Sequence, residues 1–148
     1  MSVIKKLQFK DQGQSVLIIN APKAYDEVIA LFEGEVHQQA KAADVYDFVQ
    51  VFGTSNEELK TMASHAESSV KDDGLFWLCY PKKSSKAYKS DCSRETVMVL
   101  LGDKGFEPVR QIAIDEDWSA LRFRKPDKIK TMKRNFAVTE EGIKRIEL

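Results

Sequence analysis

The chain has 148 residues, of which 43% are hydrophobic and 31% are charged, and its basic and acidic residues balance to a net charge of zero. A chain of this length is expected to form one domain whose core needs no disulfides. No apolar run approaches the ~20 residues of a membrane helix, and the first residues do not form a secretory signal, so we expect a cytoplasmic protein without membrane contact.

The charged residues are unevenly distributed along the chain. Residues 26–73 contain eleven acidic residues and three lysines. Residues 82–94 contain five basic residues and one acidic residue, and residues 122–134 contain seven and one. A protein polarised in this way can attract an anion locally while it stays neutral overall. The other interpretation of these basic stretches is a solvated lysine surface.

The first third of the chain alternates between strand and helix patterns. Residues 15–20 predict a short strand, which Pro22 ends because proline cannot extend a central ladder. Apolar residues then recur at helical spacing up to Gly34, which predicts a helix over 22–33. Residues 35–41 form a weak alternating stretch. It is either a minor edge strand or an extended link that recrosses the sheet.

The middle of the chain predicts the centre of the fold. Residues 46–52 read as a strand that ends at Gly53, and the pattern from Ser55 to Glu58 predicts a capped helix over 56–71. The continuous apolar run 75–80 is typical of a strand buried on both faces, as in parallel sheets covered by helices.

A lysine-rich and serine-rich loop, residues 82–89, follows this run, and the chain then returns to helix and strand patterns. We expect a helix over 93–104 and two strands over 106–114 and 118–124. The short turn between these strands requires antiparallel pairing. Residues 126–148 predict a basic extension packed on the single domain 1–125, with a last helix capped by Thr139. The order of elements predicts an α/β, Rossmann-like, mostly parallel sheet with helices on both faces, ending in an antiparallel hairpin.

In open α/β sheets, ligands bind outside the carboxyl ends of the strands. At those ends this sequence offers an amide, hydroxyls, lysines and an aromatic plane, which suit an anionic or phosphorylated ligand with a flat moiety. The other interpretation is turn chemistry combined with solubility. The candidate ligand-binding residues are Asn20, Lys23, Tyr80, Lys82, Lys83, Ser84, Lys86 and Trp118.

Several kinds of site are not favoured by the sequence. The turn 20–23 has no glycine, and Pro22 removes an amide donor, so we expect no nucleotide-type cofactor there. His37 and His65 lie in different predicted elements, which indicates solvated histidines and no metal site. Cys79 lies inside an apolar run, where cysteine behaves as a small hydrophobe. The acidic residues 115–117 indicate a solvated hairpin tip, and we assign no catalytic residue.

Three separated motifs occur in order over residues 6–124. A leucine-containing strand ends in Asn20-Ala-Pro, a second strand ends in Tyr80-Pro-Lys, and residues 117–124 read Asp-Trp-Ser-Ala-Leu-Arg-Phe-Arg. With these motifs the chain resembles a family of short bacterial proteins of unknown function, which implies no activity to carry over. Its layout also resembles a shortened class I methyltransferase, from which it departs at 20–23, where the methyltransferase glycines are absent.

We therefore expect a non-enzymatic module that binds a small anionic ligand or a protein partner at the carboxyl ends of its strands. The alternative is a divergent methyltransferase-like transferase that uses the same crevice. A third hypothesis is a nucleic-acid accessory protein acting through residues 122–134. The neutral net charge and the lack of a basic stripe interleaved with aromatic residues argue against nucleic acid.

Overall fold

The computed structural model describes residues 2–40 and 44–126. Its strands are β1 (Val16–Ile19), β2 (Val36–His37), β3 (Tyr46–Phe52), β4 (Val70–Pro81), β5 (Glu107–Ala113) and β6 (Trp118–Arg124). Its α-helices are α1 (Val3–Lys6), α2 (Asp26–Ile29), α3 (Asn56–Ala66) and α4 (Arg94–Val97). Its 3-10 helices are η1 (Lys23–Tyr25), η2 (Glu67–Ser69) and η3 (Gly102–Lys104).

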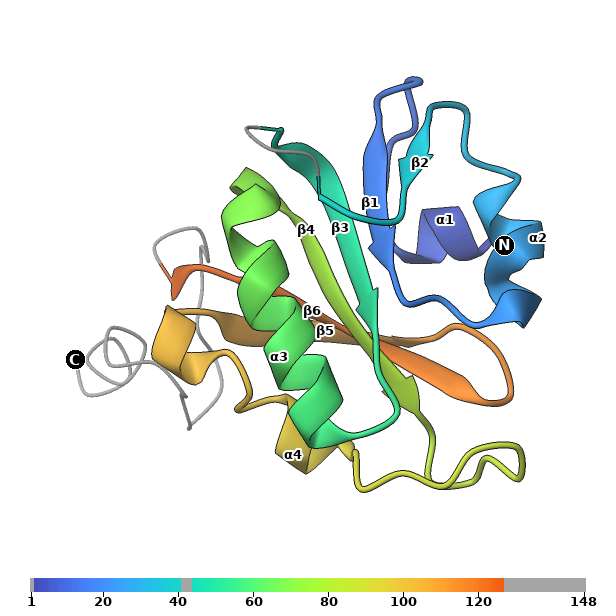
Figure 1. Cartoon of the computed structure of the whole chain (residues 1–148), viewed down its shortest axis with the longest axis vertical. Coiled ribbons are helices and arrows are strands. Elements are labelled where there is room, and N and C mark those ends of the chain that lie inside the picture. The colour runs from blue at the N-terminus through green and yellow to red at the C-terminus, as the bar shows by residue number, and fades with distance from the viewer. Residues whose placement is uncertain (1, 41–43, 127–148) are drawn as a thin grey trace.

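The six strands form one sheet in the order β2-β1-β3-β4-β6-β5 (Figure 1). Strands β2, β1, β3 and β4 run parallel, while β6 is antiparallel to both β4 and β5. The carboxyl ends of β1, β3 and β4 and the turn of the β5–β6 hairpin therefore meet at one edge of the sheet. This topology confirms the predicted mostly parallel α/β fold with a terminal antiparallel hairpin.

Helices cover both faces of the sheet, and β4 is buried between them (Figure 1). Leu78 and Tyr80 lie in the cluster that packs under α3 and α4, while Trp77 and Cys79 lie in the cluster on the opposite face with α1 and Tyr25. Residues 76–79 are completely buried, as a central strand requires. The predicted two-sided core strand is confirmed, and it fixes the position of the loop that follows it.

The weak stretch 35–41 contains a real but minor edge strand. Val36 and His37 pair in parallel with β1, and β3 lies on the other side of β1, so the chain crosses β1 between the two strands. Gly34 precedes this strand at a point where the backbone is crowded. A Cβ at Gly34 would lie 2.4 Å from the carbonyl oxygens of Gly13 and Gln14. His37 is not a solvated histidine, since its Nδ1 lies 2.6 Å from the Tyr46 hydroxyl.

The predicted helices are present but shorter than their apolar spacing indicated. The helix predicted over 22–33 is η1 and α2, and the helix predicted over 93–104 is α4 and η3. Between and after these pieces the backbone bonds run from i to i+3, as from Leu100 to Val97. An apolar residue at every third position fits a 3-10 turn as well as it fits an α-helix. In the second segment Gly102 also lowers the propensity for α-helix.

The end of α3 and the start of β4 differ from the prediction, and helix α1 was not predicted. Helix α3 begins as predicted, with the Ser55 hydroxyl capping the Glu58 amide at 3.1 Å, but it ends at Ala66 before two serines. The strand β4 consequently begins earlier than predicted, and its register with β3 is irregular near Tyr46. Helix α1 was missed, because its single turn carries no repeating apolar pattern. The predicted extension 126–148 and its Thr139 cap lie outside the described residues, apart from Pro126.

Candidate functional site

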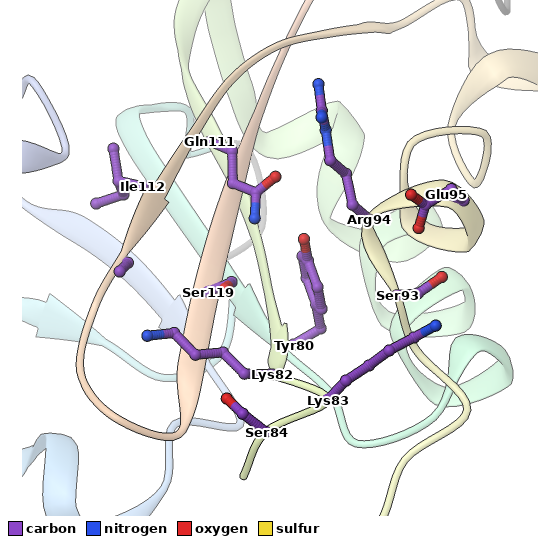
Figure 2. Close-up of a pocket in the computed structure, with 11 residues that line it drawn as sticks. Tyr80, Lys82, Lys83, Ser84, Ser93, Arg94, Glu95, Gln111, Ile112 and Ser119 are labelled. Atoms are coloured by element: carbon purple, nitrogen blue, oxygen red, sulfur yellow. The ribbon is translucent and has the colours of Figure 1, made fainter.

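A pocket of about 970 Å³ lies at the carboxyl end of β4, on the face covered by α3 and α4 (Figure 2). It is lined by the end of β4, the lysine-rich loop, the start of α4 and the β5–β6 hairpin. The lining residues are Tyr80, Lys82, Lys83, Ser84, Ser93, Arg94, Glu95, Gln111, Ile112, Ala113 and Ser119. We call this the basic pocket, because its lining contains three cationic side chains and only one carboxylate.

The register of the sheet builds the floor of the basic pocket. Ser119 of β6 lies directly opposite Tyr80 of β4 and opposite Ala113 of β5. Residues opposite each other in an antiparallel pair share a face, and so do residues two apart in one strand. Tyr80, Ser119, Ala113 and Gln111 therefore present their side chains on the same side of the sheet.

The lysine-rich loop is held against the hairpin turn. The Lys82 amide donates to the Asp117 carbonyl at 2.8 Å, and the Ser85 hydroxyl donates to the Asp117 carboxylate at 2.7 Å. The Asp115 carboxylate in turn accepts the amides of Asp117 and Trp118. These acidic residues are thus turn-forming groups, in keeping with the predicted hairpin tip. They fix the backbone from which Lys82 and Lys83 project.

The opposite wall of the basic pocket is fixed through the start of α4. The Ser93 hydroxyl accepts the Thr96 amide at 3.2 Å, and the Thr96 hydroxyl accepts the Ser93 amide at 2.9 Å, which completes a capping box. Asn56 ties this turn to α3, because it accepts from the Thr96 hydroxyl and donates its amide to Asp91. Arg94 is exposed on this anchored turn, so its guanidinium is held near the pocket without a competing ion pair in the described residues.

Tyr80 places a buried hydroxyl without a hydrogen-bond partner among the described residues at the basic pocket. Its side chain is 97% buried, and its hydroxyl has no hydrogen-bond partner among the described residues. Figure 2 shows this hydroxyl pointing into the pocket between Gln111 and Arg94. Burial raises the pKa of Tyr80 to about 12, while the Arg94 charge opposes that shift. The group is therefore a neutral hydroxyl near pH 7, and leaving it without a partner costs stability.

The candidate residues predicted from the sequence divide into two groups. Tyr80, Lys82, Lys83 and Ser84 line the basic pocket together. The other four do not line it. Asn20 and Lys23 are exposed at the end of β1, and Lys86 is exposed further along the loop. Trp118 is 4% exposed and packs against the rings of Phe52 and Tyr88, in the cluster on the other face of the sheet.

Ser93, Arg94, Glu95, Gln111, Ile112, Ala113 and Ser119 also line the basic pocket but were not singled out from the sequence. The first three follow the lysine-rich loop directly, so the helix start predicted at Ser93 was a usable signal for them. The residues of the hairpin carried no such signal, because their position depends on strand order and register.

The end of β1 does not fit a nucleotide-type cofactor such as S-adenosylmethionine. Asn20 adopts the left-handed conformation (φ 60°), and its side-chain amide donates to the Phe52 carbonyl at 2.9 Å, which bridges the ends of β1 and β3. Pro22 follows without an amide hydrogen, and the Tyr25 and Phe52 rings pack 4.8 Å apart beneath the turn. Close approach of the protein backbone to a cofactor uses glycines and free amides, and this turn has no glycine and loses one amide donor at Pro22.

The other groups considered in the sequence lie in the interior or apart. Cys79 is buried, and burial raises the pKa of its thiol, in keeping with the predicted inert hydrophobe. Within residues 2–40 and 44–126 there is no group of three or more potential metal-ligating side chains. No helix in the same part of the chain is long and apolar enough to span a membrane.

No protein-family model matches the chain, and no curated protein is significantly similar to it. Among solved structures, it resembles a SAM dependent methyltransferase from Aquifex aeolicus, with 15% identity and a TM-score of 0.54 over 82% of this chain and 86% of that one. It also resembles a protein in the NADB-Rossmann superfamily from Streptococcus agalactiae, with 12% identity and a TM-score of 0.51 over 83% of this chain and 67% of that one. A putative type 11 methyltransferase from Sulfolobus solfataricus has 12% identity and a TM-score of 0.47 over 90% of this chain and 92% of that one.

At these identities the first two likenesses describe architecture. The chain has a methyltransferase-like, Rossmann-like α/β fold.

Proposed function

We propose that the protein is a binding module that holds a small anionic molecule in the basic pocket. Lys82, Lys83 and Arg94 supply positive charge from two anchored walls, and Ser84 adds a hydroxyl. The observation that carries the proposal is the Tyr80 hydroxyl, which is buried, has no partner among the described residues and points into the pocket. A ligand oxygen that displaced the side chains covering this hydroxyl would satisfy it.

A titration with a matched control tests this proposal. Thermal-shift measurements with phosphate, pyrophosphate, citrate and sugar phosphates should show at least one anion that raises the melting temperature, by linkage to the native state. The double variant Lys83→Ala/Arg94→Ala should weaken that anion at least tenfold, because two charge-assisted contacts are lost. Lys86→Ala should leave the affinity unchanged, since Lys86 is exposed on the same loop but does not line the pocket.

Two outcomes would contradict the proposal. The first is that no anion stabilises the protein. The second is that Lys86→Ala weakens binding as much as the double variant does, which would indicate a nonspecific charge effect. A complete lack of response to small molecules would favour the other form of the hypothesis, in which the module binds a protein partner. The resemblance to short bacterial proteins of unknown function does not decide between these forms.

A second candidate function is a divergent methyltransferase-like transferase. The fold comparisons support this candidate more directly than they support a binding module, because one of the similar structures is a SAM dependent methyltransferase. The residues at the end of β1 oppose it, since Asn20 and Pro22 do not form a cofactor turn. S-adenosylmethionine belongs in the same thermal-shift panel. Stabilisation by S-adenosylmethionine that survives in Lys83→Ala/Arg94→Ala would favour the transferase.

The nucleic-acid hypothesis receives less support from the described residues. Of the basic stretch 122–134, Arg124 is already engaged, because its guanidinium donates to both carboxylate oxygens of Asp73 at 3.0 and 2.7 Å. A short oligonucleotide in the panel tests this hypothesis. Salt-sensitive stabilisation that is unchanged in Lys83→Ala/Arg94→Ala would favour it.

A further inference from the structure

We infer that the ligand of the basic pocket is a phosphorylated polyol, such as a sugar phosphate, in which the phosphate and the hydroxyl groups bind to different parts of the pocket. The inference rests on the proposed function and narrows its ligand class. It is drawn from two neutral polar groups, the Tyr80 hydroxyl and the Gln111 side chain, which lie beside Arg94 and apart from the ammonium groups of Lys82 and Lys83.

The charged part of the pocket lies at the end of β4. Figure 2 shows Lys82 and Lys83 leaving the strand end in opposite directions, with Ser84 between them. Either ammonium group can bind a phosphate group, with the Ser84 hydroxyl as a further donor, but the two ammonium groups do not converge on one point. Because their backbone is pinned to Asp117, the donors start from a fixed position.

A second part of the pocket lies further along the sheet, on the floor made by β4, β5 and β6 and beside the Arg94 guanidinium. There the Tyr80 hydroxyl points toward Gln111, and no described residue hydrogen-bonds to the Gln111 side chain (Figure 2). A tyrosine hydroxyl and a glutamine amide can each donate and accept. They match sugar hydroxyls, which also do both, better than they match an anion, which only accepts.

The size of the pocket agrees with a ligand larger than a bare anion. Its volume of about 970 Å³ is at the upper end of the range for small-molecule sites. Ala113 adds a small apolar surface beside the polar floor, against which carbon atoms of a sugar can pack, whereas the Ile112 side chain packs on the opposite face of the sheet. An inorganic phosphate would contact the lysines and leave the Tyr80 hydroxyl unsatisfied.

A matched pair of ligands tests the inference. Glucose 6-phosphate and cyclohexylmethyl phosphate carry the same charged group and a six-membered ring, but only the first has ring hydroxyls. Calorimetric titration of the full chain should show glucose 6-phosphate binding about tenfold more tightly, as expected for a site with otherwise unpaired polar groups. In Tyr80→Phe this preference should fall to about threefold or less, while the affinity for cyclohexylmethyl phosphate stays the same.

Gln111→Leu provides a second test, because Gln111 is exposed and its replacement does not touch the core. It should also reduce the preference for glucose 6-phosphate without changing the affinity for cyclohexylmethyl phosphate. The inference is overturned if wild type binds both ligands equally, if it binds neither while other anions bind, or if Tyr80→Phe and Gln111→Leu keep the full preference. In these cases anion binding itself would stand. If no anion binds at all, the proposed function fails and the inference fails with it.

Discussion

Two of the buried tyrosines, Tyr25 and Tyr80, differ in whether the hydroxyl has a hydrogen-bond partner within the protein. The Tyr25 hydroxyl donates to the Gln50 side-chain oxygen at 2.9 Å, and the Gln50 amide donates to the Cys79 sulfur at 3.3 Å, so this network is internally satisfied. The Tyr80 hydroxyl has no such partner among the described residues. Fold stability explains the first hydroxyl, and the second is the one for which we propose a ligand as the partner.

Removing each hydroxyl should therefore affect stability differently. Tyr25→Phe leaves the buried Gln50 oxygen without its donor and should lower the free energy of unfolding by about 1–3 kcal/mol. Tyr80→Phe removes a group that already lacks a partner and should change it by less than about 0.5 kcal/mol, or raise it. Urea unfolding of both variants measures the difference. An equal loss in the two variants would mean that Tyr80 has a partner within the protein.

At the scale of elements, strands were predicted more accurately than helices. β3 and β6 have the bounds predicted from the sequence, because Gly53 and the acidic turn 115–117 mark their ends. The predicted helices were too long, since apolar residues three and four apart also fit 3-10 turns. Fold class could be predicted because it depends on the order of elements, which the periodicities contain.

The candidate site could be predicted in part, for a related physical reason. Tyr80 and the lysines that follow it were found because parallel strands bring their carboxyl ends to one edge. Trp118 lies at the predicted end of the sheet but does not line the pocket, because adjacent residues in a strand point to opposite sides and Ser119 is the one that lies opposite Tyr80. Gln111 was missed because strand order and register are tertiary properties that local spacing does not encode.

At the scale of the whole molecule, the fold shows an architecture, and the proposed function rests on the side chains of the pocket. The architecture resembles that of a methyltransferase, yet the residues that could bind a ligand lie at the end of β4 and in the hairpin. A fold supports many functions, and the site decides among them. The proposed binding of an anion therefore rests on the side chains of the basic pocket, and the proposed alternative, a methyltransferase-like transferase, rests on the fold comparison.

The buried thiols and phenols predict how the stability of the whole molecule depends on pH. Burial raises the pKa of Cys79 and Cys92 above 9.0, and that of Tyr25 and Tyr80 above 10.0. Below about pH 8 these groups are protonated in both the folded and the unfolded chain. Above pH 9 the unfolded chain releases protons that the folded chain retains, so stability falls as pH rises.

Cys79→Ala isolates one of these contributions. From pH 9 to 10.5 the wild type should lose stability more steeply than Cys79→Ala, by up to about 1.4 kcal/mol per pH unit. Urea unfolding at several pH values measures both slopes. Parallel slopes would show that the Cys79 thiol titrates normally in the folded state, contrary to its complete burial.

The location of anion binding is the central claim, and amide chemical-shift mapping by NMR tests it most directly. A chain of 16.8 kDa suits the method, and glucose 6-phosphate is the probe. We predict that the largest changes lie at the amides of residues 80, 82–84, 93–95, 111–113 and 119. Changes concentrated instead at residues 20–25 and 52–55, the ends of β1 and β3, would contradict it and favour the methyltransferase-like alternative.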